Sequence, residues 1–286
     1  MGFTLSLDAA GIIGRPSLSP PPVDAHKYSR GSAMVISGPV LRTGASRLSA
    51  QAALAVGAGL VTILGQRDAL SEHATHVTAI MLREADEQFS AVDNRVRALA
   101  IGPGAGWNDD LVENVATLLL RKIPIVLDAD ALTVFEAKPE MLFAMLHEHA
   151  VLTPHEGEFA RLFSDISLAD RSDAAMQGAK RAGATLLLKG TVTVIAAADG
   201  RTATNHHNAP WLATAGSGDV LTGLICGLLA QGSAPFDAVC IGAWLHGDIG
   251  VRGGPGLTAD RMLELIPLVL AGCLGEREIH VKGSSA

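Results

Sequence analysis

A glycine-bearing turn runs straight into an apolar helical pattern at residues 213–232, ATAGSGDVLTGLICGLLAQG. Unpaired backbone N–H groups and the positive dipole end make such a helix start a site for anions. We expect Gly216, Ser217 and Gly218 to bring backbone amides close to a phosphate. Asp219 would then lie beside that phosphate, where a carboxylate can act as general base on a hydroxyl that attacks phosphorus. An ordinary acidic residue in the first turn of a helix is the alternative.

Other polar residues follow buried strand patterns, where side chains at the edge of a sheet can reach a ligand. His155 and Glu158 stand in TPHEGEF, and Lys189 follows LLL. The lysine suits phosphate charge, or it is a solvated strand end. Asp128 and Asp130 in LDADAL are further candidates, although we favour a role in satisfying the backbone where strand meets helix.

The remaining histidines and cysteines predict no further chemistry. His206, His207 and Asn208 are interpreted as loop residues, since two adjacent histidines do not complete a metal coordination sphere. His246 lies within an apolar helical pattern and is interpreted as a hydrogen-bonded packing residue. The three cysteines lack CxxC spacing and lie in apolar surroundings, which favours buried, reduced thiols in a cytosol.

Short apolar runs alternate with helical patterns from residue 33 onward, which predicts an α/β fold with a mostly parallel sheet flanked by helices. The runs interpreted as strands are AMVIS, VTIL, HVTAIML, ALAIG, IPIVLD, AVLTP and TLLLKG. Two further strands around the Asp199-Gly200 turn predict an antiparallel edge. The clearest helical patterns cover residues 46–59, 218–231, 236–251 and 258–271.

Composition limits the class of protein. The chain has 286 residues and 48% hydrophobic residues, enough for one large domain, which we place at residues 24–286 behind a proline-containing arm at 1–23. With 22 basic and 29 acidic residues the net charge is -7, and no basic run suggests a nucleic-acid partner. The opening residues lack a signal-peptide pattern, and no apolar run predicts a membrane span, so a cytoplasmic location is expected.

Several motifs together resemble one family. HKYSRGSAMVISG, TGASRLSAQAALAVGAGLVTI, IGPGAG, LDADAL, LTPHEGEFARL, LLLKGTVTVIA and ATAGSGDVLTG occur in the order seen in NAD(P)H-hydrate dehydratases of the ribokinase-like superfamily. The resemblance covers roughly Asp24 to Pro267, and an ordered set of motifs is more specific than a single glycine loop. Glu156 stands where many relatives have proline, and the first glycine-rich loop, SGPVLRTGAS, also departs from the usual pattern.

The resemblance implies a set of site residues. It assigns Ala45, Gly104, His155 and Asp219 to the hydrated nicotinamide nucleotide, with Asp219 as the catalytic base. Those implied around the adenine nucleotide are Lys189, Gly190, Thr191, Val192, Thr193, Gly216, Ser217 and Gly218. By analogy with the Asn-x-x-Glu motif of ribokinase-like kinases, Glu158 could order the water shell of Mg²⁺.

The implied activity is the ADP- or ATP-dependent dehydration of NADHX or NADPHX to the reduced dinucleotide. The resemblance also implies a homo-oligomer, and a separate epimerase chain, because the chain has no room for the epimerase domain that some relatives carry. Two other functions stay open. A ribokinase-like kinase of small molecules would use the same base and anion site, and a noncatalytic nucleotide sensor would bind without turnover.

Overall fold

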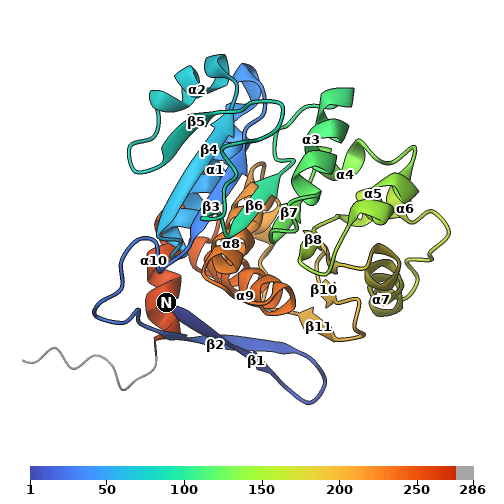
Figure 1. Ribbon diagram of the computed structural model, residues 1–286. Helices are drawn as coiled ribbons and strands as arrows, with labels where there is room; N and C mark the ends of the chain where they lie inside the picture. The colour runs from blue at the N-terminus through green and yellow to red at the C-terminus, as the bar shows by residue number, and fades with distance from the viewer. Residues whose placement is uncertain (275–286) are drawn as a thin grey trace, which may run out of the picture.

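The computed structural model describes residues 1–274, and a nine-stranded sheet forms its centre (Figure 1). The strand order is β11-β10-β9-β8-β7-β6-β3-β4-β5. Seven neighbouring strands pair in parallel, and β10 pairs antiparallel with both β9 and β11. Their bounds are β3 Ser32–Ile36, β4 Leu60–Gly65, β5 Met81–Glu84, β6 Ala98–Ile101, β7 Ile125–Leu127, β8 Ala150–Leu152, β9 Thr185–Leu188, β10 Thr193–Ala196 and β11 Thr202–Asn205.

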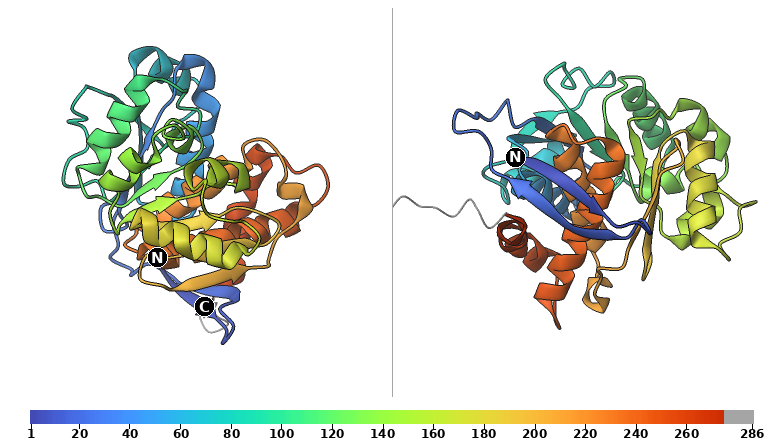
Figure 2. Two further views of the ribbon diagram at one scale, coloured as in Figure 1. Left: turned by 90° about the vertical axis from the view of Figure 1, so that its right-hand side faces the viewer. Right: turned by 90° about the horizontal axis from the view of Figure 1, so that it is seen from below.

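Helices cover both faces of the sheet, which is why the central strands are continuous apolar runs rather than alternating patterns (Figure 2). One buried cluster lies between the sheet and α1 Thr43–Ala55, α8 Ser217–Ala230, α9 Pro235–Gly253 and α10 Ala259–Cys273. The other lies under α3 Asp109–Leu119, α4 Asp130–Thr133, α5 Pro139–Met145, α6 Glu156–Leu162 and α7 Arg171–Ala182. Helix α2, Arg67–Ala74, contacts β4 and β5.

Close packing of α8 against α1 fixes the helix that carries the AGSGD motif. A Cβ atom on Gly223 would lie 2.2 Å from the carbonyl oxygen of Ser49, and one on Gly227 would lie 2.6 Å from that of Ala53. These two glycines therefore let the helices approach backbone to backbone. The start of α8 therefore belongs to an almost fully buried helix.

The predicted fold class is confirmed, including the parallel sheet, the helices on both faces and the antiparallel edge. Four predicted helices are present, with their ends shifted by a few residues. The predicted strand at residues 76–82 is wrong in position, because β5 covers Met81–Glu84. This strand lies at the edge of the sheet and is largely exposed, so it lacks the apolar run that identifies a buried strand.

The segment expected as an arm contains a β-hairpin that the sequence did not reveal. Strands β1, Gly2–Leu7, and β2, Ile13–Ser19, pair antiparallel and contact α9 (Figure 1). Ile13 and Leu18 are buried in the larger core, at 4% and 5% exposure. The division of the chain at residue 23 stays a prediction. Within residues 1–274, no helix is long and apolar enough to cross a membrane.

Candidate functional site

The predicted site residues come from loops at the carboxyl ends of adjacent parallel strands. Asp128 directly follows β7, His155 lies just beyond β8, and Lys189 follows β9. The loop that contains Gly104 follows β6. Since these strands are parallel neighbours, their carboxyl ends share one edge of the sheet, and the start of α8 lies beside it.

The start of α8 has the geometry of an anion site. Gly216 precedes the helix at φ 85°, a conformation that favours glycine, and no side chain caps the helix. A Cβ on Gly218 would lie 3.9 Å from both Asp128 Oδ2 and Lys189 Nζ, with no closer neighbour. The first turn therefore presents backbone amides toward open space beside a lysine.

A partly buried ion pair lies next to this helix start. Lys189 Nζ is 2.7 Å from Asp128 Oδ1 and 3.9 Å from Glu158 Oε2, and Thr222 donates to Asp128 Oδ2 at 2.7 Å. Burial would lower the pKa of Lys189, but the facing carboxylates outweigh it and keep that pKa raised. Burial would raise the pKa of Asp128, yet Lys189 keeps it lowered. Both groups therefore remain charged.

The predicted role of Asp128 in satisfying the backbone is wrong, because its carboxylate oxygens bond to the side chains of Lys189 and Thr222. For Asp130 the same prediction is confirmed, since the backbone amide of Gly106 donates to its Oδ2 at 2.8 Å. The two neighbouring aspartates therefore differ in function. One holds a lysine at the site, and the other holds the loop after β6.

Asp219 lies in the first turn of α8 among these charges. Burial, helped by the charges of Asp128 and Asp130, raises its pKa to about 6 against the opposing pull of Lys189. A carboxyl with that pKa is ionised near neutral pH and is basic enough to take a proton. Asp219 therefore has the electrostatic properties of a general base, while its role stays a prediction.

His155 and Glu158 form the start of α6. His155 Nδ1 accepts from the backbone amide of Glu158 at 3.1 Å, and Glu158 Oε2 accepts from the backbone amide of His155 at 2.8 Å. This reciprocal capping box fixes both side chains. Glu158 is buried, so its carboxylate is held toward Lys189 rather than toward solvent.

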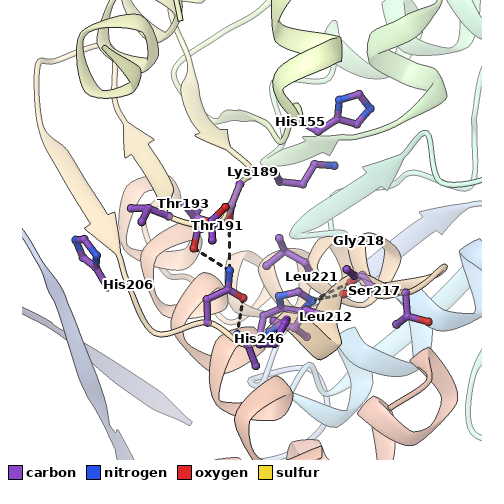
Figure 3. A pocket seen from close by; sticks show the side chains of 17 residues that line it. His155, Lys189, Thr191, Thr193, His206, Leu212, Ser217, Gly218, Leu221 and His246 are labelled. Carbon is purple, nitrogen blue, oxygen red and sulfur yellow. Dashed lines mark hydrogen bonds between the residues drawn. The ribbon is translucent and has the colours of Figure 1, made fainter. Parts of the chain in front are cut away.

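Seven of the eight predicted nucleotide-binding residues line one cavity of about 1000 Å³ (Figure 3). Its lining includes the predicted residues His155, Lys189, Gly190, Thr191, Val192, Thr193, Ser217 and Gly218. We call it the nucleotide cavity. Gly216 and Asp219 are sequence neighbours of residues that line the cavity, but they do not line it themselves. Ala45 and Gly104 do not line it either.

His246 also lines the nucleotide cavity while serving the predicted packing role. Its Nε2 lies 2.9 Å from the Oγ atom and 3.0 Å from the carbonyl oxygen of Ser217 (Figure 3). Burial lowers the pKa of His246 to about 4, so the ring is neutral near pH 7. It therefore fixes the first residue of α8 without adding charge.

Two residues for which the sequence predicts no role at the site hold the loop at 189–193. Arg171 donates to the carbonyl oxygens of Leu188, Lys189 and Val192 at 3.2–3.3 Å. Asn208 donates to the carbonyl oxygen of Thr191 at 2.9 Å. Arginine in a helix and asparagine in a loop are common surface residues, so neither carries a sequence signal for this role.

The two remaining substrate-side predictions, Ala45 and Gly104, lie together. A Cβ atom on Gly104, which has φ 65°, would lie 3.2 Å from Ala45 Cβ and 2.6 Å from the carbonyl oxygen of Arg42. The loop after β6 thus packs directly on the start of α1. Ala45 and Gly104 thus form a group of their own, whereas His155, which is also predicted to bind the substrate, lines the nucleotide cavity.

Comparison with known proteins identifies the family of the chain. The family model described as NAD(P)H-hydrate dehydratase matches residues 33–263. The chain belongs to the NAD(P)H-hydrate dehydratase family. It is 38% identical to the ADP-dependent (S)-NAD(P)H-hydrate dehydratase of Neisseria meningitidis over 78% of this chain and 77% of that protein.

Other members of the family are longer. The bifunctional NAD(P)H-hydrate repair enzyme Nnr of Moorella thermoacetica is 39% identical over 90% of this chain but only 52% of its own length. The chain therefore spans about half the length of such relatives. Among solved structures, the ADP/ATP-dependent NAD(P)H-hydrate dehydratase of Bacillus subtilis, co-crystallised with ATP and Mg²⁺, has a TM-score of 0.78 and 25% identity, covering 90% of this chain and 95% of that one.

Proposed function

We propose that the protein dehydrates NADHX or NADPHX to NADH or NADPH, with ADP or ATP as phosphoryl donor. The family match over most of the chain supports this function. The observation that carries it is the uncapped start of α8, where Ser217 and Gly218 line the nucleotide cavity beside Lys189 and Asp219 follows in the same turn. A base in that turn can serve an acceptor that meets the nucleotide there.

In the proposed reaction, Asp219 removes the proton from the ring hydroxyl of the hydrate. The hydroxyl oxygen forms a bond to the terminal phosphorus of the nucleotide, and the bond from that phosphorus to the bridging oxygen breaks. The backbone amides of residues 216–218 and the ammonium of Lys189 stabilise the transferring group, because its negative charge faces fixed donors. Asp128 and Thr222 keep this machinery oriented.

The second half of the reaction is an elimination. Phosphate leaves the ring carbon with the electron pair of the carbon–oxygen bond, driven by the lone pair of the ring nitrogen. The adjacent carbon then loses a proton, and the ring double bond is restored. Phosphorylation is what makes the step possible, since hydroxide is a poor leaving group.

The site suits an Mg²⁺ ion that is bound mainly by nucleotide phosphates and water rather than by a set of protein ligands. Residues 1–274 contain no group of three or more metal-ligating side chains. Magnesium commonly retains waters and shares phosphates with one or two carboxylates, so the buried Glu158 is the residue that would order its water shell. The ion would screen the phosphate charges.

Assays of the purified protein test the function directly. We expect NADH absorbance to recover when hydrated NADH, Mg²⁺ and ADP or ATP are added, with one phosphate released for each NADH. Asp219→Asn should slow this recovery by about 10²–10⁴-fold and leave nucleotide affinity within about twofold. Recovery that does not require nucleotide, or that persists in the variant, contradicts the proposal.

A small-molecule kinase is the second candidate, because the same base and anion site would serve it. Its stable phosphorylated product distinguishes it from a dehydratase, which releases inorganic phosphate. Nucleotide binding without turnover on any acceptor would instead indicate a sensor. We further propose a homo-oligomer in the cytoplasm that receives epimerised substrate from a separate chain, with the buried free cysteines supporting a reducing compartment.

A further inference from the structure

A second cavity, of about 620 Å³, lies at the carboxyl ends of β3, β4 and β5 and against α3. Strand β3 is paired with β4 on one side and with β6 on the other, so the order of the strands reverses beside this cavity. Ligands of open α/β sheets bind in the crevice at such a switch point. No residue lines both this cavity and the nucleotide cavity.

Carboxylates face this cavity, which we call the acidic cavity, from two walls. Asp86 and Glu87 follow β5, while Asp110 and Glu113 come from α3. No described residue of the lining is a lysine or an arginine. The backbone amide and side chain of Ser90 hold the pKa of Asp86 below its usual range, so Asp86 stays ionised near neutral pH.

The acidic cavity adjoins the loop that contains Gly104, one of the predicted substrate residues. Gly38, Ala105 and Gly106 line it, and they belong to the loops that surround Gly104. A Cβ on Gly38 would lie 1.8 Å from the carbonyl oxygen of Gly104, so the two loops touch through their backbones. A dinucleotide with its ring at Gly104 can therefore extend its other end along this wall, and the volume suits one nucleoside.

We propose that the acidic cavity holds the adenosine end of the hydrated dinucleotide and selects a free ribose 2′-hydroxyl, so that NADHX is converted in preference to NADPHX. This inference rests on the proposed dehydratase function. A carboxylate accepts hydrogen bonds from a ribose hydroxyl, whereas dinucleotide sites that take a 2′-phosphate provide an arginine. The 2′-phosphate would bring negative charge among four carboxylates in a lining that contains no lysine or arginine.

The test compares kcat/KM for NADHX and NADPHX under identical Mg²⁺ and nucleotide concentrations. We expect the ratio to favour NADHX by at least about tenfold at low salt and to shrink as salt rises, because exposed charges are screened. A ratio near one, or one that favours NADPHX, overturns the inference while leaving the dehydratase function intact. If neither hydrate is converted, the proposed function fails and the inference fails with it.

Reversing the charge of two carboxylates of the acidic cavity tests whether this cavity determines the selectivity. Glu87→Lys and Glu113→Lys together should raise kcat/KM for NADPHX, lower it for NADHX, and reduce the ratio at least about fivefold. Glu264→Lys makes the same kind of change on an exposed position of α10 and is the matched control. If the double variant and the Glu264→Lys control change the kcat/KM ratio equally, the acidic cavity does not determine the selectivity and the inference is overturned. If the double variant does not fold, Glu87→Gln with Glu113→Gln should still reduce the ratio, and an unchanged ratio overturns the inference.

Discussion

At the residue scale, the proposed base Asp219 should set the pH range of the proposed reaction. Its pKa of about 6 arises from burial first and from Asp128 next. A general base acts only when it is deprotonated, so we expect kcat/KM to level off above about pH 6 and to fall about tenfold per unit below it. A pH profile of kcat/KM for the wild-type protein measures this fall. A midpoint near pH 4 would contradict the proposed surroundings of Asp219.

Sequence reasoning identified candidate side chains without revealing their partners. The AGSGD motif pointed to Asp219 because a glycine turn before an apolar helix is a local pattern. The pairing of Asp128 with Lys189 joins residues 61 positions apart, and no local spacing predicts it. For the same reason Asn208 was interpreted only as a loop residue, although it holds the carbonyl oxygen of Thr191.

At the element scale, the two glycines at the start of α8 have different roles. Gly216 has φ 85°, and a Cβ there would lie 2.7 Å from Ala259 Cβ, so Gly216→Ala should reduce stability by about 1–3 kcal/mol. Gly218 has room for a methyl group, but that group would stand where a phosphate oxygen approaches the amide. Gly218→Ala should therefore fold normally and weaken ADP binding by about 10–100-fold.

Thermal unfolding and calorimetric ADP titration of the two variants check this contrast. Unchanged ADP affinity in a folded Gly218→Ala protein would count against the anion site at the start of α8. Normal stability of Gly216→Ala would show that the turn tolerates a side chain. The two substitutions control for each other, since each adds one methyl group within the same motif.

Elements buried on both faces could be predicted from sequence, and exposed ones could not. Strands β6 to β9 are fully buried and, apart from Thr185, apolar, so their sequence identifies them. Strand β5, Met81–Glu84, is an exposed edge strand, and the apolar run before it led the prediction to residues 76–82. Tertiary position, rather than local propensity, decides where such a strand forms.

At the scale of the whole molecule, the N-terminal hairpin connects the β11 edge of the sheet to helices α9 and α10. The amide of Thr204 in β11 donates to the carbonyl oxygen of Gly11, and β2 contacts α9 and α10 (Figure 2). The hairpin therefore covers apolar helix surface and blunts an exposed sheet edge. Its alternating pattern is short and interrupted by Pro16, which explains why the sequence suggested only an arm.

Removal of residues 1–19 should consequently destabilise the fold. Ile13 and Leu18 are buried, and losing two such side chains exposes apolar area worth about 3–6 kcal/mol. Ile13→Ser should account for about half of that loss, whereas Ile12→Ser, at a neighbouring position with 38% exposure, should change stability by less than about 0.5 kcal/mol. Urea unfolding of the three proteins measures these differences. If the shortened chain unfolds at the wild-type midpoint, residues 24–286 form the domain alone, as the sequence predicts, and the hairpin adds nothing to it.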